Sequence, residues 1–193
     1  MPPRIPPQSA AESGSHRTEL DARLSAELAS VVSGARRRAL RDGDRQIDTA
    51  HLLHSLLESD PQVRAVFDGG PRVARLLGYL VQRSIGYGLR WQGTVESSGA
   101  LPVAAEADES PVAAEAGWSP VAAGAMEGAC ERAELRGDGQ ARCLDLLAAI
   151  LDDPQSRAVE VLGRAGVDAP ALLLRIETGA EFEEYVGGGR QGC

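Results

Sequence analysis

GDRQIDTAHLLHSLLESDPQ, residues 43–62, contains a helix start, an apolar helix face and the start of a further helix. The same features return at residues 137–155, which read GDGQARCLDLLAAILDDPQ. Both copies open with Gly-Asp, carry a quartet of aliphatic residues at the spacing of one helix face, and close with Asp-Pro-Gln before Arg-Ala-Val. Shared spacing across separate features indicates an internal duplication, and this duplication organises the whole chain.

Each copy predicts four helices joined by short turns. In the first copy, apolar residues at helical spacing from Leu24 onward predict a helix that stops near Gly43. Asp48 or Thr49 can cap the second helix, and Asp60 can cap the third. The predicted fold is all-α, with two four-helix repeats related by a pseudo-twofold axis. In the second copy we expect helices at about 120–136, 143–152, 154–165 and 169–178.

The rest of the chain has a composition that does not favour a packed core. Proline and small polar residues dominate the N-terminus, which predicts a disordered tail. A tandem of PVAAEADES and PVAAEAGWS predicts a low-complexity linker between the repeats. The predicted organisation is a disordered tail at 1–19, a first repeat at 20–85, the linker at 86–118, a second repeat at 119–179 and a flexible tail at 180–193.

Charge and composition narrow the classes of function. The formal net charge of -8 disfavours broad binding to nucleic acids or anionic membranes, because the surface repels phosphate. No signal peptide and no membrane span are expected, since no apolar run is long enough. Three cysteines without CxxC spacing suit reduced thiols rather than a disulfide framework or a zinc site. We therefore expect a cytoplasmic protein.

The repeats resemble a known family, the double-repeat N-terminal domain of the Clp ATPases ClpA, ClpB and ClpC. The second helix of each family repeat begins Ile-Gly-Thr-Glu-His-Leu-Leu. Here residues 47–53 read Ile-Asp-Thr-Ala-His-Leu-Leu, and residues 141–147 are an eroded copy, Ala-Arg-Cys-Leu-Asp-Leu-Leu. Trp-Ser-Pro at 118–120 matches the family's aromatic-Thr/Ser-Pro opening, and residues 161–168 match its closing Val-Leu-x-x-x-Gly-Val-Asp. The resemblance covers about 20–83 and 118–178.

The resemblance implies a stand-alone, non-catalytic protein-binding module that acts as an adaptor, decoy or regulator in Clp-linked proteostasis. The chain has no lysine, so it lacks the G-x-x-x-x-G-K-[ST] loop that ATP hydrolysis by a Clp ATPase requires. Implied partners are a Clp subunit, a substrate, an adaptor or a hydrophobic small molecule. Ligand-binding residues carried over from the family lie at the two helix starts: Thr49, Ala50, His51, Cys143, Leu144 and Asp145.

Two of these positions argue against one family ligand. Members that recognise phosphoarginine use the glutamate of each Thr-Glu-His motif to bind the guanidinium, and here those positions are Ala50 and Leu144. We therefore expect apolar pockets at both helix starts and no useful affinity for phosphoarginine.

The residues that could carry chemistry give no complete active site. His51 and His54 lie three apart on one predicted helix and could form half of a metal site, but no third ligand follows at suggestive spacing. We expect one histidine to be packed between helices and the other to be exposed. Cys130 and Cys143 have no histidine nearby in the sequence, and buried thiols are their default state. No catalytic residue, metal or cofactor is predicted.

Two alternative functions remain open. One alternative is a DNA-binding regulator that uses Arg36, Arg37, Arg38, Arg41 and Arg45, although the solvated face of a helix is the favoured explanation of these residues. A metal-dependent enzyme would need zinc or iron in the purified protein. A mobility shift that disappears in moderate salt would support the first alternative, and metal analysis would support the second.

Overall fold

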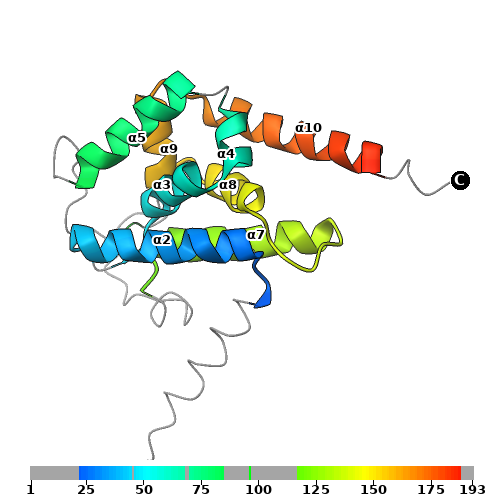
Figure 1. Cartoon of the computed structure of the whole chain (residues 1–193), viewed down its shortest axis with the longest axis horizontal. Helices are drawn as coiled ribbons and strands as arrows, with labels where there is room; N and C mark the ends of the chain where they lie inside the picture. Colours follow the sequence, from blue (N-terminus) through cyan, green and yellow to red (C-terminus); the bar gives the residue numbers. More distant parts are fainter. Residues whose placement is uncertain (1–21, 45, 68–69, 85–95, 97–116, 188–193) are drawn as a thin grey trace, which may run out of the picture.

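The computed structural model describes residues 22–44, 46–67, 70–84, 96 and 117–187. Within these segments the chain forms eight helices and no strand (Figure 1). The prediction of an all-α fold is therefore confirmed. None of the helices in this described part is long and apolar enough to cross a membrane.

The first repeat contains four helices, and side chains at their starts explain where three of them begin. Ser25, Asp48 and Asp60 each accept a backbone N–H from the first turn of the following helix. Gly43 ends the first helix at φ 73°, a left-handed conformation that favours glycine. The helices are α2 (Ala26–Asp42), α3 (Thr49–Ser59), α4 (Pro61–Val66) and α5 (Gly70–Ser84).

The second repeat repeats this pattern. Ser119 caps its first helix as Ser25 does in the first repeat, and Gly137 ends that helix at φ 78° as Gly43 does. The helices are α7 (Pro120–Leu135), α8 (Cys143–Leu151), α9 (Arg157–Arg164) and α10 (Ala169–Gly187).

Two details of the prediction are wrong. Helix α9 begins at Arg157 and not near 154, because the Ser156 hydroxyl caps it by accepting the N–H of Val159. Helix α10 runs to Gly187 rather than ending near 178, and the sequence of its last turns, residues 179–187, contains three glutamates and no proline.

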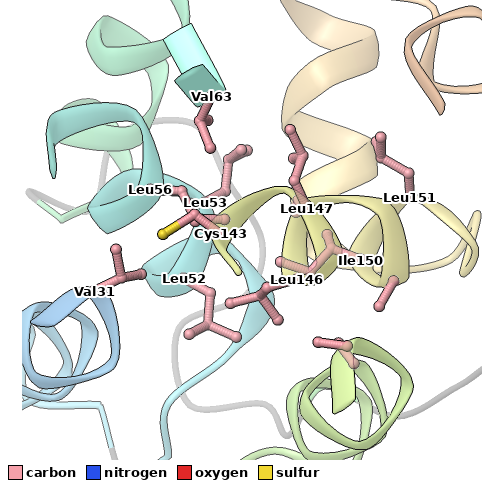
Figure 2. Packing of buried hydrophobic residues seen from close by; sticks show 14 of the residues in the cluster. Val31, Leu52, Leu53, Leu56, Val63, Cys143, Leu146, Leu147, Ile150 and Leu151 are labelled. Atoms are coloured by element: carbon pink, nitrogen blue, oxygen red, sulfur yellow. The ribbon is translucent and has the colours of Figure 1, made fainter. Parts of the chain in front are cut away.

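Helices α3 and α8 form the centre of the molecule. Helices α2 and α7 lie on one side of this central pair, and the other four helices lie on the opposite side (Figure 1). Nine residues of α3 and eight of α8 are buried, so these two short helices are covered on nearly every face. Their leucines meet in a single core, where Leu53 and Leu147 are fully buried (Figure 2).

The two repeats are interlocked. Helix α9 of the second repeat packs on α3, and helix α4 of the first repeat packs on α8. Backbone hydrogen bonds also join them in pairs: the Ile47 N–H donates to Gly117 O at 2.7 Å, and the Ala141 N–H donates to Arg23 O at 2.8 Å. Each repeat therefore completes the core of the other, which agrees with the predicted pseudo-twofold arrangement.

Equivalent glycines let the first two helices of each repeat approach closely. A Cβ on Gly34 of α2 would lie 3.0 Å from Ser55 Oγ on α3. A Cβ on Gly128 of α7 would lie 3.3 Å from Ala149 Cβ on α8. Gly128 thus has a packing role that offsets its low helix propensity.

Most of the predicted linker and the N-terminal tail lie outside the described residues. We predict that limited proteolysis will cut within 97–116, because the sequence there is of low complexity. The two fragments should stay associated, since the repeats share one core. Size-exclusion chromatography after digestion checks this result. Elution of two separate fragments would contradict the interlocked packing.

Candidate functional site

The six residues predicted to bind a ligand lie at the starts of α3 and α8, and five of them are buried. Thr49, Ala50 and His51 are at most 1 % exposed, and only Leu144 reaches intermediate exposure. The other two, Cys143 and Asp145, are 3 % and 6 % exposed. Their role in ligand binding stays a prediction, and the structure shows how each helix start is occupied by the chain itself.

At the first helix start, the side chain of Glu96 lies between the two repeats. Its Oε2 accepts the backbone N–H of Thr49 at 2.9 Å and the hydroxyl of Ser119 at 2.8 Å. Its Oε1 accepts the Thr49 hydroxyl and the backbone N–H of Arg157 at 2.7 Å. Glu96 is 4 % exposed. One carboxylate therefore bonds α3, α9 and the residue that caps α7.

The local backbone explains why this position takes a carboxylate. Thr49 and Arg157 are the first residues of α3 and α9, so their N–H groups have no partner within the helix. The N-termini of α3 and α9 also direct their partial positive charges towards the position of this carboxylate. The arrangement is an anion cradle made of two backbone amides and two hydroxyls, and Glu96 fills it from within the chain.

A buried ion pair lies beside this cradle. Arg157 Nη1 donates to Asp48 Oδ2 at 2.7 Å, and Asp48 is the residue that caps α3. The Ala158 N–H donates to the Thr49 hydroxyl at 3.1 Å. These contacts connect the start of α9 to the start of α3, and they add to the interlocking of the repeats.

The second helix start is occupied by a different network. Arg136 forms two hydrogen bonds to Asp145, at 2.5 and 2.8 Å, and a third to Asp138. Arg142 also donates to Asp138, at 2.6 Å. The pKa of the Arg136 guanidinium is raised, first because of its hydrogen bond to Asp145. This network holds the end of α7 against the start of α8.

The expectation of apolar pockets at the helix starts is therefore wrong. Ala50 and Leu144 do remove a carboxylate from each start, but charged residues from elsewhere in the fold fill the space. Glu96 supplies the charge at α3, and Arg136 supplies it at α8. Neither residue belongs to the motif, so the motif alone could not reveal them.

His51 is held from three sides by acidic residues. Its Nδ1 lies 2.8 Å from Asp48 Oδ1, and its backbone N–H donates to the same oxygen. Its Nε2 lies 3.2 Å from Asp44 Oδ2 and 3.8 Å from Asp42 Oδ2. The sequence predicted no third metal ligand, whereas the fold brings Asp44 and Asp48 to His51 with ligand atoms within 4.8 Å of one another. His54 is not part of this group.

His54 is buried as well, which contradicts the expectation that one of the two histidines is exposed. It is 4 % exposed, and it contacts Arg38 through Nδ1 at 3.2 Å and Glu58 through Nε2 at 3.3 Å. Arg38 also pairs with Glu58. Burial, assisted by the Arg38 charge, lowers the pKa of His54 from 6.5 to about 4. His54 is therefore neutral at pH 7.

This lowered pKa predicts a pH dependence of stability. Below about pH 6.5 the unfolded chain protonates His54 and the folded chain does not, so stability falls as the pH drops towards 4. The contribution that is lost amounts to about 2–3 kcal/mol. Urea unfolding at a series of pH values should show this slope, and His54→Gln should flatten it. An unchanged slope in the variant would mean that His54 titrates normally.

The cysteines are placed as expected for structural thiols. Cys130 and Cys143 are both buried and free. Burial raises the pKa of each thiol, and Asp60 raises that of Cys143 further. Both are therefore protonated at neutral pH, a state that is poorly nucleophilic.

Comparisons with known proteins identify the fold. No protein-family model matches the chain, and no curated protein matches it. Among solved structures it is similar to the N-terminal domain of the caseinolytic protease associated chaperone ClpD from Arabidopsis thaliana, with a TM-score of 0.55 and 15 % sequence identity. The chain has the fold of that domain. The match covers 82 % of this chain and 95 % of the ClpD domain, so it includes both repeats.

Proposed function

We propose that this chain is a non-catalytic protein-binding module that acts as an adaptor, decoy or regulator in Clp-linked proteostasis. The observation that supports the proposal is the fold: two interlocked repeats that superpose on nearly the whole N-terminal domain of a Clp chaperone. The matched domain is part of a chaperone, a protein that acts on other proteins. A fold alone, however, permits many functions. The proposal therefore depends on finding the partner.

Exposed aliphatic side chains near the ends of two equivalent helices are suited to protein contacts. Leu40 lies near the end of α2 and is 73 % exposed, and Leu135 ends α7 and is 89 % exposed. Leucines that project this far bury their surface only when another molecule covers them. We propose that these two ends contribute to partner binding.

The direct test is capture of partners from the native cell. The tagged full-length chain is cross-linked in cells, purified and analysed for Clp ATPase subunits and their substrates by mass spectrometry. We expect a Clp subunit or a Clp substrate to be enriched, and Leu40→Ser with Leu135→Ser to reduce the enrichment. Val81→Ser on α5 is the matched control, since Val81 is also exposed. Absence of Clp components with the unmodified chain would contradict the proposed function.

We also predict that phosphoarginine does not bind. Ala50 is fully buried and offers no carboxylate to a guanidinium, and the amides and hydroxyls beside it already bind Glu96. Titration of free phosphoarginine to about 1 mM, a range that would detect a free energy of binding near -4 kcal/mol, should leave the amide signals of 48–52 and 142–146 unmoved. Saturable shifts of these signals at micromolar ligand would contradict the prediction.

The nucleic-acid alternative has less structural support. Arg38, in the middle of the basic stretch, is already paired with Glu58 and contacts His54. Arg45 lies outside the described residues. A gel-shift assay at low salt tests this alternative, and we expect no shift because the net charge of -8 repels DNA.

A further inference from the structure

We propose that two copies of this chain form a dimer in which the basic end of α2 in each copy contacts the acidic end of α7 in the other. The inference deepens the proposed function, because it rests on the assignment of these two helix ends to protein contacts and names a second copy of the chain as the partner. The basic end consists of the exposed residues Arg37, Leu40 and Arg41, and the acidic end consists of the exposed residues Glu127, Glu131, Glu134 and Leu135.

The two ends are equivalent in the duplication but opposite in charge. The alignment of the repeats pairs Arg37 with Glu131, and both side chains lie on the outer face of their helix. Within the residues that the structure describes, Arg37, Arg41 and Glu131 form no ion pair, whereas Glu134 pairs with Arg23. Most of the charge at both ends is therefore available to a second molecule.

The inner sides of the same two ends are alike, so the difference in charge is confined to the surface. Arg38 of α2 pairs with Glu58 of α3. The equivalent Arg132 of α7 pairs with Asp152, the residue that follows α8, at 2.8 Å. The two helix ends therefore have the same orientation on the core, and their outer residues occupy corresponding places. Two basic ends repel each other, whereas a basic end and an acidic end attract.

The directions of α2 and α7 allow both contacts to form at once. The two helices run in opposite directions along one side of the central pair (Figure 1). The start of α2 lies beside the end of α7, where Arg23 pairs with Glu134 at 2.5 Å. The basic end and the acidic end thus lie at opposite ends of one side of the molecule. A second copy turned over by a twofold axis across this side places each basic end against an acidic end, and the assembly closes as a dimer.

Two leucines supply apolar surface to the contact. Leu40 and Leu135 are highly exposed, and surface ion pairs contribute little affinity by themselves. Burial of the leucines therefore provides much of the attraction, while the charges select the partner's face and its orientation. Because the contact surfaces are small, we expect a weak dimer with a Kd of about 10–100 µM. The chain is then a monomer in dilute solution.

Sedimentation equilibrium of the purified full chain tests the dimer. The average mass should rise with concentration from 20.3 kDa, the mass of one chain, towards twice this value. In about 0.5 M NaCl the Kd should increase by at least about threefold, because salt screens exposed charges. A mass of one chain up to about 0.5 mM, or a Kd that salt does not change, would overturn the proposal. Masses that grow beyond a dimer would also overturn it, because they indicate open chains.

Charge reversal identifies the faces in contact. Arg37→Glu combined with Arg41→Glu should weaken self-association by at least about tenfold. Glu127→Arg combined with Glu131→Arg should weaken it to a similar extent, and Glu134 is left unchanged because it pairs with Arg23. Arg75→Glu is the control, since Arg75 is exposed on α5 at the opposite side of the molecule, and it should leave the Kd unchanged. Equal weakening by this control would overturn the proposal.

Mixing the two reversed variants gives the sharpest test. Neither should self-associate, but an equimolar mixture should form a heterodimer, because both contacts again join opposite charges. Both variants keep a negative net charge, since each pair of reversals changes the formal charge of -8 by four. A mixture of folded variants that stays monomeric would overturn the proposal, and the salt dependence of the unmodified chain decides the question if either variant unfolds. No Clp component is present, so failure here is distinct from failure of the proposed function.

Discussion

Replacing Glu96 with alanine will lower the free energy of unfolding by about 3–5 kcal/mol, among the largest effects of any single substitution in this chain. The carboxylate accepts hydrogen bonds from two backbone amides and two hydroxyls, all of them buried. Removing it leaves these donors without a partner, and each unsatisfied buried donor costs about 1–3 kcal/mol. Water entering the space recovers part of this loss, which is why the expected total lies below the sum.

A second substitution at position 96 separates the effect of losing the charge from the effect of losing the side-chain volume. Glu96→Gln keeps the size of the side chain but turns an NH2 group towards N–H donors, so it should cost less than alanine and still more than about 1 kcal/mol. Glu131→Gln, on the exposed face of α7, is the control and should change stability by less than about 0.5 kcal/mol. Urea denaturation measures all three variants. A loss below about 1 kcal/mol for Glu96→Ala would show that Glu96 does not occupy the cradle in solution.

Leu53→Ala and Leu147→Ala will each destabilise the chain by about 2–5 kcal/mol. Both side chains are fully buried where α3 meets α8, and neighbouring leucines surround them (Figure 2). Truncation to alanine removes apolar contacts and leaves a cavity that short, enclosed helices cannot close by moving. The two residues are equivalent in the duplication, so we expect similar losses at both.

The control and the double variant test the shared core. Leu135→Ala, at an 89 % exposed position, should cost less than about 0.5 kcal/mol. The effects of Leu53→Ala and Leu147→Ala should not simply add in the double variant, because both belong to one core cluster. Losses below about 1 kcal/mol at both positions would mean that this stripe does not face the core.

Local signals in the sequence identified most of the helices. Helix starts were predicted correctly at Pro61 and Pro120, and Asp48, one of the two residues expected to cap α3, does cap it, since a capping side chain or an N-terminal proline acts within its own turn. The prediction failed at α9 because both Asp153 and Ser156 can cap a helix, and the sequence gives no reason to prefer the second. In the structure Ser156 caps α9, and the backbone N–H of the next residue, Arg157, donates to Glu96.

Buried polar residues were the least predictable part of the candidate site. Glu96 lies within a segment whose composition predicts a linker, and its partners are 23 to 61 residues away in the sequence. His54 lies on the same helix as His51, and the sequence could not show that Arg38 and Glu58 would enclose it. In both cases the deciding contacts come from segments that the local pattern does not connect.

The sequence by itself determined the duplication, the all-α class and the helices with strong caps, because periodicity and capping depend on residues within a few positions of one another. Only the tertiary structure decided how the repeats interlock and which groups occupy the two helix starts. It also brought Asp42, Asp44 and Asp48 around His51. These outcomes depend on side chains from separate helices meeting in a buried space, where a polar group stays only when another segment supplies its partner.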